Sequence, residues 1–357
     1  MTLIIAEAGV NHNGSEALAI SLIDAAYDSG ADIVKFQTFK AKSLVTHEAK
    51  QANYQITNTQ KTESQLSMLS RLELSYEAHL RLVSYCEKLG IQFLSTAFDS
   101  ESLGFLVDDL QVQTLKIASG EITNAPFLLE HARTGCDLIL STGMSTLADI
   151  ELALGVIAFG LTAATNVPPS KEAFQAAYAS SEGQQALKTK VTLLHCTTEY
   201  PAPFDQINLR AIDTLASAFA LPVGYSDHSK GIAIPIAAAA RGALIIEKHF
   251  TLDKKLPGPD HKASLEPDEL KDMVTAIRTV ELAMGNGIKA PQASELKNLP
   301  IARKSIVTIT DIKKGQLFSE HNIAIKRPGT GSSPIQYWQK LNTAAERDYS
   351  AGEVIND

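Results

Sequence analysis

The feature that most constrains this chain is a regular alternation of two kinds of segment over its first 285 residues. Short apolar runs alternate with longer segments of helical periodicity, such as 16–29, 75–89 and 147–159. The eight candidate strands are 3–8, 33–39, 92–97, 114–119, 137–142, 191–197, 221–226 and 244–250. Strands separated by helices form parallel sheets, and eight such units in this length favour a closed barrel over an open doubly wound sheet. We therefore expect an α/β protein with a (β/α)8 barrel, the TIM barrel, over residues 1–285.

The remainder of the chain has a different pattern. Gly287, Pro291 and Pro300 indicate a linker over 286–300, and 301–357 is predicted to be a small β-rich domain with strands 305–309 and 323–325. A domain of this size buries too little surface to be stable alone, so it should dock on another surface.

Two insertions interrupt the alternation. Residues 42–71 are polar and follow the second strand, so they should lie near the carboxyl ends of the strands, where barrel enzymes have their sites. Residues 163–190 precede the sixth strand and should lie on the opposite face, away from any site.

The composition excludes several classes of protein. A formal net charge of −8 argues against a general nucleic-acid or membrane-surface binder. The longest apolar stretch, 232–246, is broken by Pro235 and Arg241, and the first apolar run reaches Glu7 too soon for a signal peptide. The three widely spaced cysteines are typical of buried, reduced thiols. We therefore expect a cytoplasmic protein with neither a nucleic-acid nor a membrane partner.

The carboxyl ends of the candidate strands are polar almost without exception. In a barrel these ends meet on one face, and functional residues lie there. The residues expected at this face are Glu7, Lys35, Gln37, Thr96, Asp99, Lys116, Ser119, Glu121, Ser141, Thr142, His195, Thr197, Glu199, Tyr200, Ser226, Asp227, His228, Glu247, Lys248 and His249.

Lys35 and Lys116 lie inside β-rich runs, where strand alternation can point them into the barrel mouth. A buried ammonium group needs a counter-charge, which Glu7 or Glu121 could supply as a structural partner. The functional alternative is an anionic ligand, because the Ser-Gly and Ser-Thr-Gly turns after strands four and five offer hydroxyl and N–H donors to a phosphate.

His228 and His249 end the adjacent strands seven and eight. Neutral imidazoles so placed can share one divalent cation, with Glu7 across the seam that closes the barrel. These residue types fit Mn, Fe, Co or Zn. Asp260, in the Pro- and Gly-rich loop after strand eight, either faces the site or stabilises its own turn.

Nine motifs occur in a distinctive order along the chain. They are IIAEAGVNHNG, VKFQTF, FLSTAFD, KIASGE, ILSTGM, LLHCTTEYPAP, GYSDHS, IEKHFTLDKKLPGPDHKASLEP and KRPGTG. Together they resemble the sialic acid synthase family over nearly the whole chain, and the long block that begins IEKHF is specific to it. The C-terminal domain resembles the antifreeze-like (SAF) domain of these synthases.

The resemblance implies an enzyme that condenses phosphoenolpyruvate with N-acetylmannosamine, an N-acetylated hexosamine, to give N-acetylneuraminate and phosphate. It implies metal ligation by His228 and His249, usually to Mn²⁺. The residues implied to hold phosphoenolpyruvate are Thr96, Lys116, Ser119, Ser141 and Ser226, and those implied to face the sugar or the reacting centre are Glu7, Lys35, Gln37, Tyr200 and Asp260.

The resemblance also implies a homodimer in which each C-terminal domain covers the partner's barrel mouth, so that Arg327 contacts the N-acyl group of the sugar. One position departs from the family pattern. Thr198 stands where many relatives have Asn, and Thr is shorter and lacks the amide donor. The resemblance implies that this position contacts the phosphate, here through a hydroxyl group.

Three alternatives stay open at this point. Legionaminic acid synthases, which use a 2,4-diacetamido-2,4,6-trideoxymannose, and the more distant pseudaminic acid synthases share the reaction but differ in the sugar. A metal-dependent aldolase on the same barrel would use pyruvate and release no phosphate. A protein that binds ice or carbohydrate would need a flat, Thr-patterned C-terminal domain, whereas this one is charged and irregular.

Overall fold

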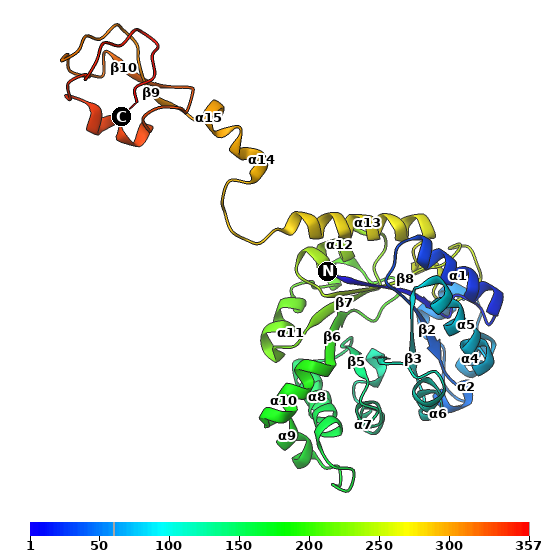
Figure 1. Ribbon diagram of the computed structural model, residues 1–357. Helices are drawn as coiled ribbons and strands as arrows, with labels where there is room; N and C mark the ends of the chain where they lie inside the picture. Colours follow the sequence, from blue (N-terminus) through cyan, green and yellow to red (C-terminus); the bar gives the residue numbers. More distant parts are fainter. Residues whose placement is uncertain (60, 357) are drawn as a thin grey trace. The chain divides into compact units, whose positions relative to one another are not determined.

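The computed structural model describes residues 1–59 and 61–356, and within them eight parallel strands close into a barrel (Figure 1). The strands are β1 (Leu3–Gly9), β2 (Ile33–Thr38), β3 (Gln92–Ala97), β4 (Thr114–Ile117), β5 (Asp137–Ser141), β6 (Val191–Cys196), β7 (Val223–Asp227) and β8 (Ile245–His249). β1 pairs with both β2 and β8, with Glu7 opposite Lys35 on one side and His249 on the other. The predicted TIM barrel is confirmed.

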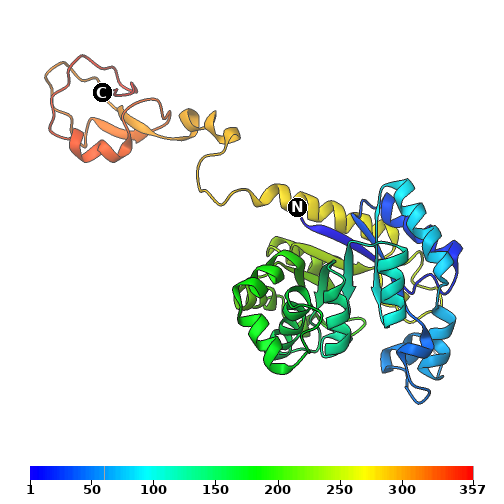
Figure 2. The ribbon, with the colours of Figure 1, turned by 60° about the horizontal axis from the view of Figure 1, so that its bottom comes forward.

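Helices surround the barrel on its outside (Figures 1 and 2). The main ones are α1 (Glu16–Asp28), α5 (Tyr76–Leu89), α6 (Ser100–Gly104), α7 (Ala125–Arg133), α8 (Leu147–Thr162), α11 (Ala211–Phe219), α12 (Ala233–Ala240) and α13 (Pro267–Met284). Side-chain caps define where several of them begin: Ser15 and Ser75 accept N–H groups of α1 and α5, and Thr146 forms a capping box with Asp149 in α8. The helices bury their apolar faces against the strands and form the main core.

A second, smaller core fills the barrel itself. Its members are Ile5, Ile33, Leu94, Ile139, Leu194 and Ile245. Gly224 takes the corresponding place in β7, because a Cβ atom there would lie 2.6 Å from Leu194 and 2.7 Å from Ile245. This apolar layer closes the barrel below the carboxyl ends of its strands.

The two insertions are helical. The first forms α2 (Ala41–Leu44), α3 (Asn53–Thr59) and α4 (Gln65–Leu72), and its residues contribute to the cavity described below. The second forms α9 (Lys171–Ala179) and α10 (Ser181–Lys190), which pack against α8, and none of its residues lines that cavity.

Sequence patterns misplaced some strand ends by one or two residues. The fourth strand was predicted to reach residue 119, but β4 ends at Ile117 and Ser119 starts a 3₁₀ turn, Ser119–Glu121. The seventh was predicted to begin at 221, but Pro222 precedes β7 and lacks the N–H that a strand pairs.

The chain divides into two compact units, Met1–Gly285 and Asn286–Asp357. The second unit contains α14 (Ala293–Leu296), α15 (Leu299–Ala302), the antiparallel strands β9 (Ser305–Thr308) and β10 (Ile323–Lys326), and α16 (Tyr337–Lys340). Its own core is Ile306, Ile312, Phe318, Ile323, Ala345, Tyr349 and Ile355. Among the described residues, no helix is long and apolar enough to cross a membrane.

Candidate active site

Strand alternation builds a cavity of about 290 Å³ above the apolar layer of the barrel. In five strands the cavity-lining side chain lies two residues after a member of that layer. These pairs are Ile5 and Glu7, Ile33 and Lys35, Leu94 and Thr96, Ile139 and Ser141, and Ile245 and Glu247. Because side chains two residues apart on a strand face the same side, the polar residues of the site lie directly above the apolar layer.

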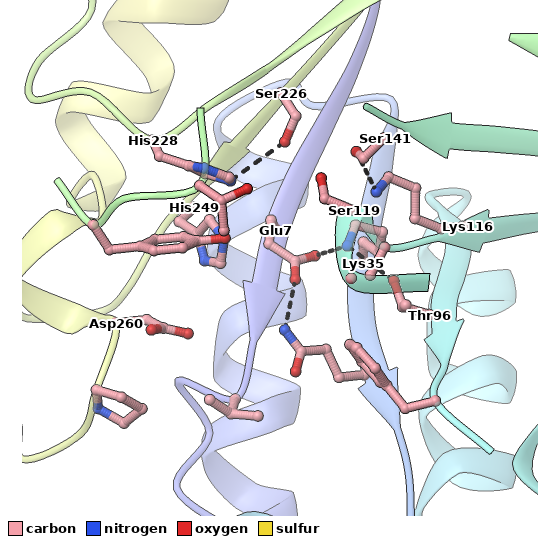
Figure 3. Close-up of a pocket in the computed structure, with 18 of the residues that line it drawn as sticks. Glu7, Lys35, Thr96, Lys116, Ser119, Ser141, Ser226, His228, His249 and Asp260 are labelled. Carbon is pink, nitrogen blue, oxygen red and sulfur yellow. Dashed lines mark hydrogen bonds and ion pairs between the residues drawn. The ribbon is translucent and has the colours of Figure 1, made fainter. Parts of the chain in front are cut away.

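A network of buried charges lies at the base of the cavity (Figure 3). The Lys35 Nζ lies 2.7 Å from Glu7 Oε2 and 3.6 Å from Glu247 Oε2. The Lys116 Nζ lies 3.7 Å from Glu247 Oε1 and donates a hydrogen bond of 2.8 Å to Ser141 Oγ. Glu247 thus stands between the two ammonium groups, and Ser226 Oγ donates to it at 2.8 Å.

The pKa values of the two carboxyl groups of this network, those of Glu7 and Glu247, shift in opposite directions. Burial raises the pKa of Glu7 to about 7, although Lys35 acts against it. Burial would also raise the pKa of Glu247, but Lys116 and Lys35 outweigh it and lower that pKa to about 2. Burial lowers the pKa of Lys116, whereas the two carboxylates raise the pKa of Lys35 in spite of burial. Glu247 is therefore the fixed counter-charge, and Glu7 can exchange a proton near neutral pH.

The hydroxyl groups of Ser119 and Thr198 and the N–H group of Gly143 lie close together beside Lys116. The Gly143 N–H donates to Ser119 Oγ at 3.0 Å, and Ser119 Oγ lies 3.1 Å from Cys196 Sγ. A Cβ atom on Gly143 would lie 2.3 Å from Thr198 Oγ1, so glycine permits this close approach. The Thr198 hydroxyl is buried and has no hydrogen-bond partner among the described residues. It is therefore available to a ligand, as expected of a donor that awaits an anion.

His228 and His249 lie side by side, with ring centroids 5.6 Å apart. Burial lowers the pKa of His228 to about 4, and burial together with His228 lowers the pKa of His249 well below its usual value. The His228 Nδ1 lies 2.7 Å from the carbonyl oxygen of Thr197, which leaves Nε2 as an acceptor, and His249 Nδ1 is buried without a partner in the described chain.

Two neutral imidazoles that each keep an acceptor nitrogen fit a divalent cation, although His228 Nε2 also lies 3.5 Å from Ser226 Oγ. In the described part of the chain no three His, Cys, Asp or Glu side chains come close enough to hold one by themselves. Glu7, the carboxylate expected across the seam, is held instead by Lys35 and by Gln37, whose Nε2 donates at 3.3 Å. Substrate and water would therefore have to supply the remaining ligands.

Asp260 lies at the rim of the cavity, in the loop after β8 (Figure 3). Burial raises the pKa of its carboxyl group to about 6. No described residue donates a hydrogen bond to that carboxyl group, so it can accept one from a ligand hydroxyl. The Tyr200 ring packs against His228, with centroids 4.1 Å apart, and closes the other side of the rim.

The structure brings nearly all of the sequence-predicted site residues together in this one cavity. They are Glu7, Lys35, Gln37, Thr96, Lys116, Ser119, Ser141, Thr198, Tyr200, Ser226, His228, His249 and Asp260. Arg327 belongs to the second unit, where its Nε donates to the carbonyl oxygen of Ala302 at 3.0 Å.

Two features of the cavity were missed. The sequence analysis named Glu247 among the polar residues at strand ends but assigned it no role. Strand alternation from His249 would have pointed Glu247 into the barrel, beside Lys35. An apolar side of the cavity was not foreseen, because helical apolar residues in an insertion read as ordinary core. Its lining residues are Val10, Met68, Leu69, Leu72, Phe98 and Pro259.

A TIM barrel with buried ammonium groups, a buried Thr198 hydroxyl that has no partner among the described residues, and neutral imidazoles at its carboxyl face defines a barrel enzyme for a small anionic substrate. Residues 22–289 match the NeuB family, and the chain belongs to this family of sialic acid synthases and their relatives.

Relatives of known sequence agree with this assignment over the full length of the chain. The N,N'-diacetyllegionaminic acid synthase of Campylobacter jejuni is 50% identical over 356 residues, which cover 100% of this chain and 99% of the relative. The enzyme of the same name from Legionella pneumophila is 44% identical, and the match covers 99% of this chain and 92% of that enzyme. The N-acetylneuraminic acid synthetase of Leptospira borgpetersenii, solved with citrate, is 35% identical, with a TM-score of 0.66 over 83% of this chain and 90% of that one.

Proposed function

We propose that the protein condenses phosphoenolpyruvate with 2,4-diacetamido-2,4,6-trideoxymannose to give N,N'-diacetyllegionaminate and phosphate. The observation that carries the chemistry is one cavity in which Lys35, Lys116 and the unpaired Thr198 hydroxyl lie beside two neutral imidazoles. The sugar follows from the relatives, since those named for legionaminic acid are 50% and 44% identical and the N-acetylneuraminic acid synthetase is 35% identical. The N-acetylmannosamine substrate that the sequence placed first is less well supported than this alternative.

Phosphoenolpyruvate would bind over Lys116, with donors from Ser119, Ser141 and Thr198 around its anionic groups. In the described part of the chain, the one carboxylate within ion-pair distance of the Lys116 Nζ is that of Glu247, at 3.7 Å. An incoming anion can therefore pair with Lys116 without displacing a close ion pair. Lys35 and Thr96, which are hydrogen-bonded at 3.3 Å, complete the positive side.

His228 and His249 would hold the divalent cation, which we propose to be Mn²⁺. When bound, the cation polarises the aldehyde oxygen of the open-chain sugar and makes that carbon electrophilic. The chain's own residues orient the partners: Asp260 and Tyr200 hold the sugar at the rim, and the lysines hold phosphoenolpyruvate below it.

In the reaction, C3 of phosphoenolpyruvate forms a bond to the aldehyde carbon, and water adds to C2. Glu7 is placed to take the proton of that water, since its pKa of about 7 suits a general base at neutral pH. Lys35 and Lys116 stabilise the developing charges, and the adduct loses phosphate by cleavage of the C–O bond. Oxygen-18 placed in the bridging position of phosphoenolpyruvate should leave with phosphate, and its recovery in the keto acid would exclude this route.

We further infer a homodimer in which the C-terminal unit of each chain covers the partner's cavity and presents Arg327 to the N-acyl group of the sugar. The support is that this unit carries exposed apolar side chains, among them Ile335 and Trp338 at 80% and 75% exposure. Light scattering on the full chain should show a dimer, and an active monomer would contradict this inference.

The direct test is phosphate release from phosphoenolpyruvate by chelator-treated protein to which Mn²⁺ is restored. We expect turnover with the trideoxy sugar to exceed turnover with N-acetylmannosamine. The opposite preference would assign the protein as an N-acetylneuraminate synthase. Product formed from pyruvate, with no phosphate released, would assign it as an aldolase.

A further inference from the structure

One side of the cavity is apolar, in contrast to its charged base. Met68, Leu69 and Leu72 of α4, which we call the α4 wall, line the cavity together with Val10 and Phe98. These residues form a cluster of their own, separate from the main core of the barrel. An apolar surface inside a site for charged substrates has to match an apolar part of a ligand.

The α4 wall is fixed in place by contacts on each side. Ser64 caps the first turn of α4, and Gln51 Nε2 lies 3.4 Å from the Met68 sulfur. The turn after β1 comes so close that a Cβ atom on Gly14 would lie 2.4 Å from the carbonyl oxygen of Arg71. The wall is therefore a preformed surface of the cavity.

Contacts across the rim tie the same insertion to the other side of the cavity. Asn58 Nδ2 in α3 donates at 2.7 Å to the carbonyl oxygen of Pro259, next to Asp260. The insertion thus bridges from β2 to the loop after β8, and the cavity is lined both by α4 and by this loop.

The reacting groups decide which end of the acceptor meets the wall. The aldehyde carbon must lie near the base, where the lysines and imidazoles are, so the far end of the sugar, C4 to C6, extends toward the rim. In N-acetylmannosamine that end carries hydroxyl groups at C4 and C6. In the trideoxy sugar it carries a methyl group at C6 and an acetamido group at C4.

The α4 wall has no polar atom that could replace water around a hydroxyl group, so binding a C6 hydroxyl there leaves it without hydrogen bonds. A methyl group loses nothing and gains apolar contact. Gln55 lies beside the wall with its side chain buried, and its Oε1 accepts the Ala52 N–H at 2.9 Å. Its amide nitrogen donates to no described residue and is free to bond the carbonyl oxygen of a C4 acetamido group.

We propose that the α4 wall is the specificity determinant of this enzyme, and that with Gln55 it selects 6-deoxy, 4-acylamino sugars over sugars hydroxylated at C4 and C6. This inference rests on the proposed function and adds to it the residues that distinguish the two acceptors.

The test measures kcat/KM for three acceptors with Mn²⁺ and phosphoenolpyruvate: the trideoxy sugar, N-acetylmannosamine, and 2-acetamido-2,6-dideoxymannose, which isolates the effect at C6. In Leu69→Asn, a change at a half-buried position, we expect the preference for the trideoxy sugar over N-acetylmannosamine to fall about 10- to 100-fold. Met68→Gln should act in the same direction, and Gln55→Leu should lower kcat/KM for the trideoxy sugar but not for the dideoxy sugar.

Ser70→Asn, on the exposed side of the same helix, is the matched control and should leave the preference unchanged. The KM for phosphoenolpyruvate should stay the same in every variant, which distinguishes lost selectivity from general damage. An unchanged preference in both active wall variants would overturn this inference and leave the proposed function intact. Failure of the unmodified enzyme to use any of the three sugars would overturn the proposed function and this inference with it.

Discussion

Two buried lysine networks lie on opposite faces of the same barrel wall, and they differ in whether their charged groups are fully hydrogen-bonded. In the outer network the charged groups are, although the uncharged Ser229 hydroxyl is buried without a partner among the described residues. Outside the strands, Lys248 pairs with Asp227 at 2.6 Å, and the other oxygen of Asp227 accepts from Tyr225 Oη at 3.1 Å and from the Ser229 N–H at 2.9 Å. Lys248 also donates to the carbonyl oxygen of Ser229. Both charged side chains are fully buried.

Inside the barrel, equally buried lysines are left incomplete. Among the described residues, Glu247 Oε2 has no hydrogen-bond partner, and neither do the nearby Thr198 Oγ1 and His249 Nδ1. A buried polar group without a partner costs folding free energy, so a site that keeps several of them must meet a ligand that satisfies them. The outer network stabilises the fold, whereas the inner one is arranged for a substrate.

The strongest test of this difference removes one lysine from the inner network. Lys116→Met should lower kcat/KM about 10²- to 10³-fold or more, because it removes the charge that stabilises the phosphate and its transition state. Its free energy of unfolding should stay the same or rise, since a desolvated charge is replaced by an apolar chain. Phosphate release and urea denaturation measure the two effects, with exposed Lys230→Met as the control. Loss of stability without loss of activity would reverse the assigned roles.

The outer network should respond in the opposite way. Asp227→Asn leaves Lys248 buried without a counter-charge, so the free energy of unfolding should fall by about 3–5 kcal/mol. The double variant Asp227→Leu, Lys248→Met should regain most of this loss, and a double-mutant cycle by urea denaturation measures the coupling. Independent, additive effects of the two changes would show that the pair is not the structural unit described here.

Divalent metal provides a further test of this comparison, because we propose that it binds to the inner network and not to the outer one. With Mn²⁺ at 100 times its dissociation constant, the folded protein should gain about 2.7 kcal/mol in unfolding free energy. His249→Gln should abolish this gain while phosphoenolpyruvate binding, measured by calorimetry, persists. An equal gain in the variant would place the metal elsewhere.

The smallest effect concerns Asp260, whose buried carboxyl group lacks the partners that Asp227 has. Burial raises its pKa from 3.8 to about 6, so the folded protein holds a proton that the unfolded chain releases. Stability from this group is present below pH 4 and is lost as the pH rises to about 6. Asp260→Asn should remove that slope and gain about 1–3 kcal/mol at pH 7, while activity falls. Parallel pH profiles of unfolding in the two proteins would contradict this.

The sequence was sufficient to predict the barrel and the face that carries the site, because both depend on local periodicity. Strand alternation and the rule for strand ends brought Lys35, Lys116 and His249 to the same cavity. Alternation from His249 also points Glu247 into the barrel and Lys248 away from it, but it does not give their partners. Those partners, Lys35, Lys116 and Asp227, depend on register and closure, which involve residues far apart in the chain.

The apolar side of the cavity could not be predicted for a different reason. Met68 and Leu72 have the spacing of any amphipathic helix, and only the docking of α4 beside the turn at Gly14 makes them part of a site. That docking is a tertiary contact, and its cause lies in the packing of an insertion rather than in a motif.

The seam between β1 and β8 has a consequence for synthesis on the ribosome. Asn11 Nδ2 donates to the carbonyl oxygen of Phe250, 239 residues later in the chain. At about 5–20 residues per second, the N-terminal strand waits roughly 10–50 s for the partner that completes its pairing. During that time Lys35 and Lys116 lack Glu247, so the nascent chain cannot bury them without cost. On the proposed function, metal and substrate would bind only after translation has passed β8, so that ligand binding would report completion of the barrel.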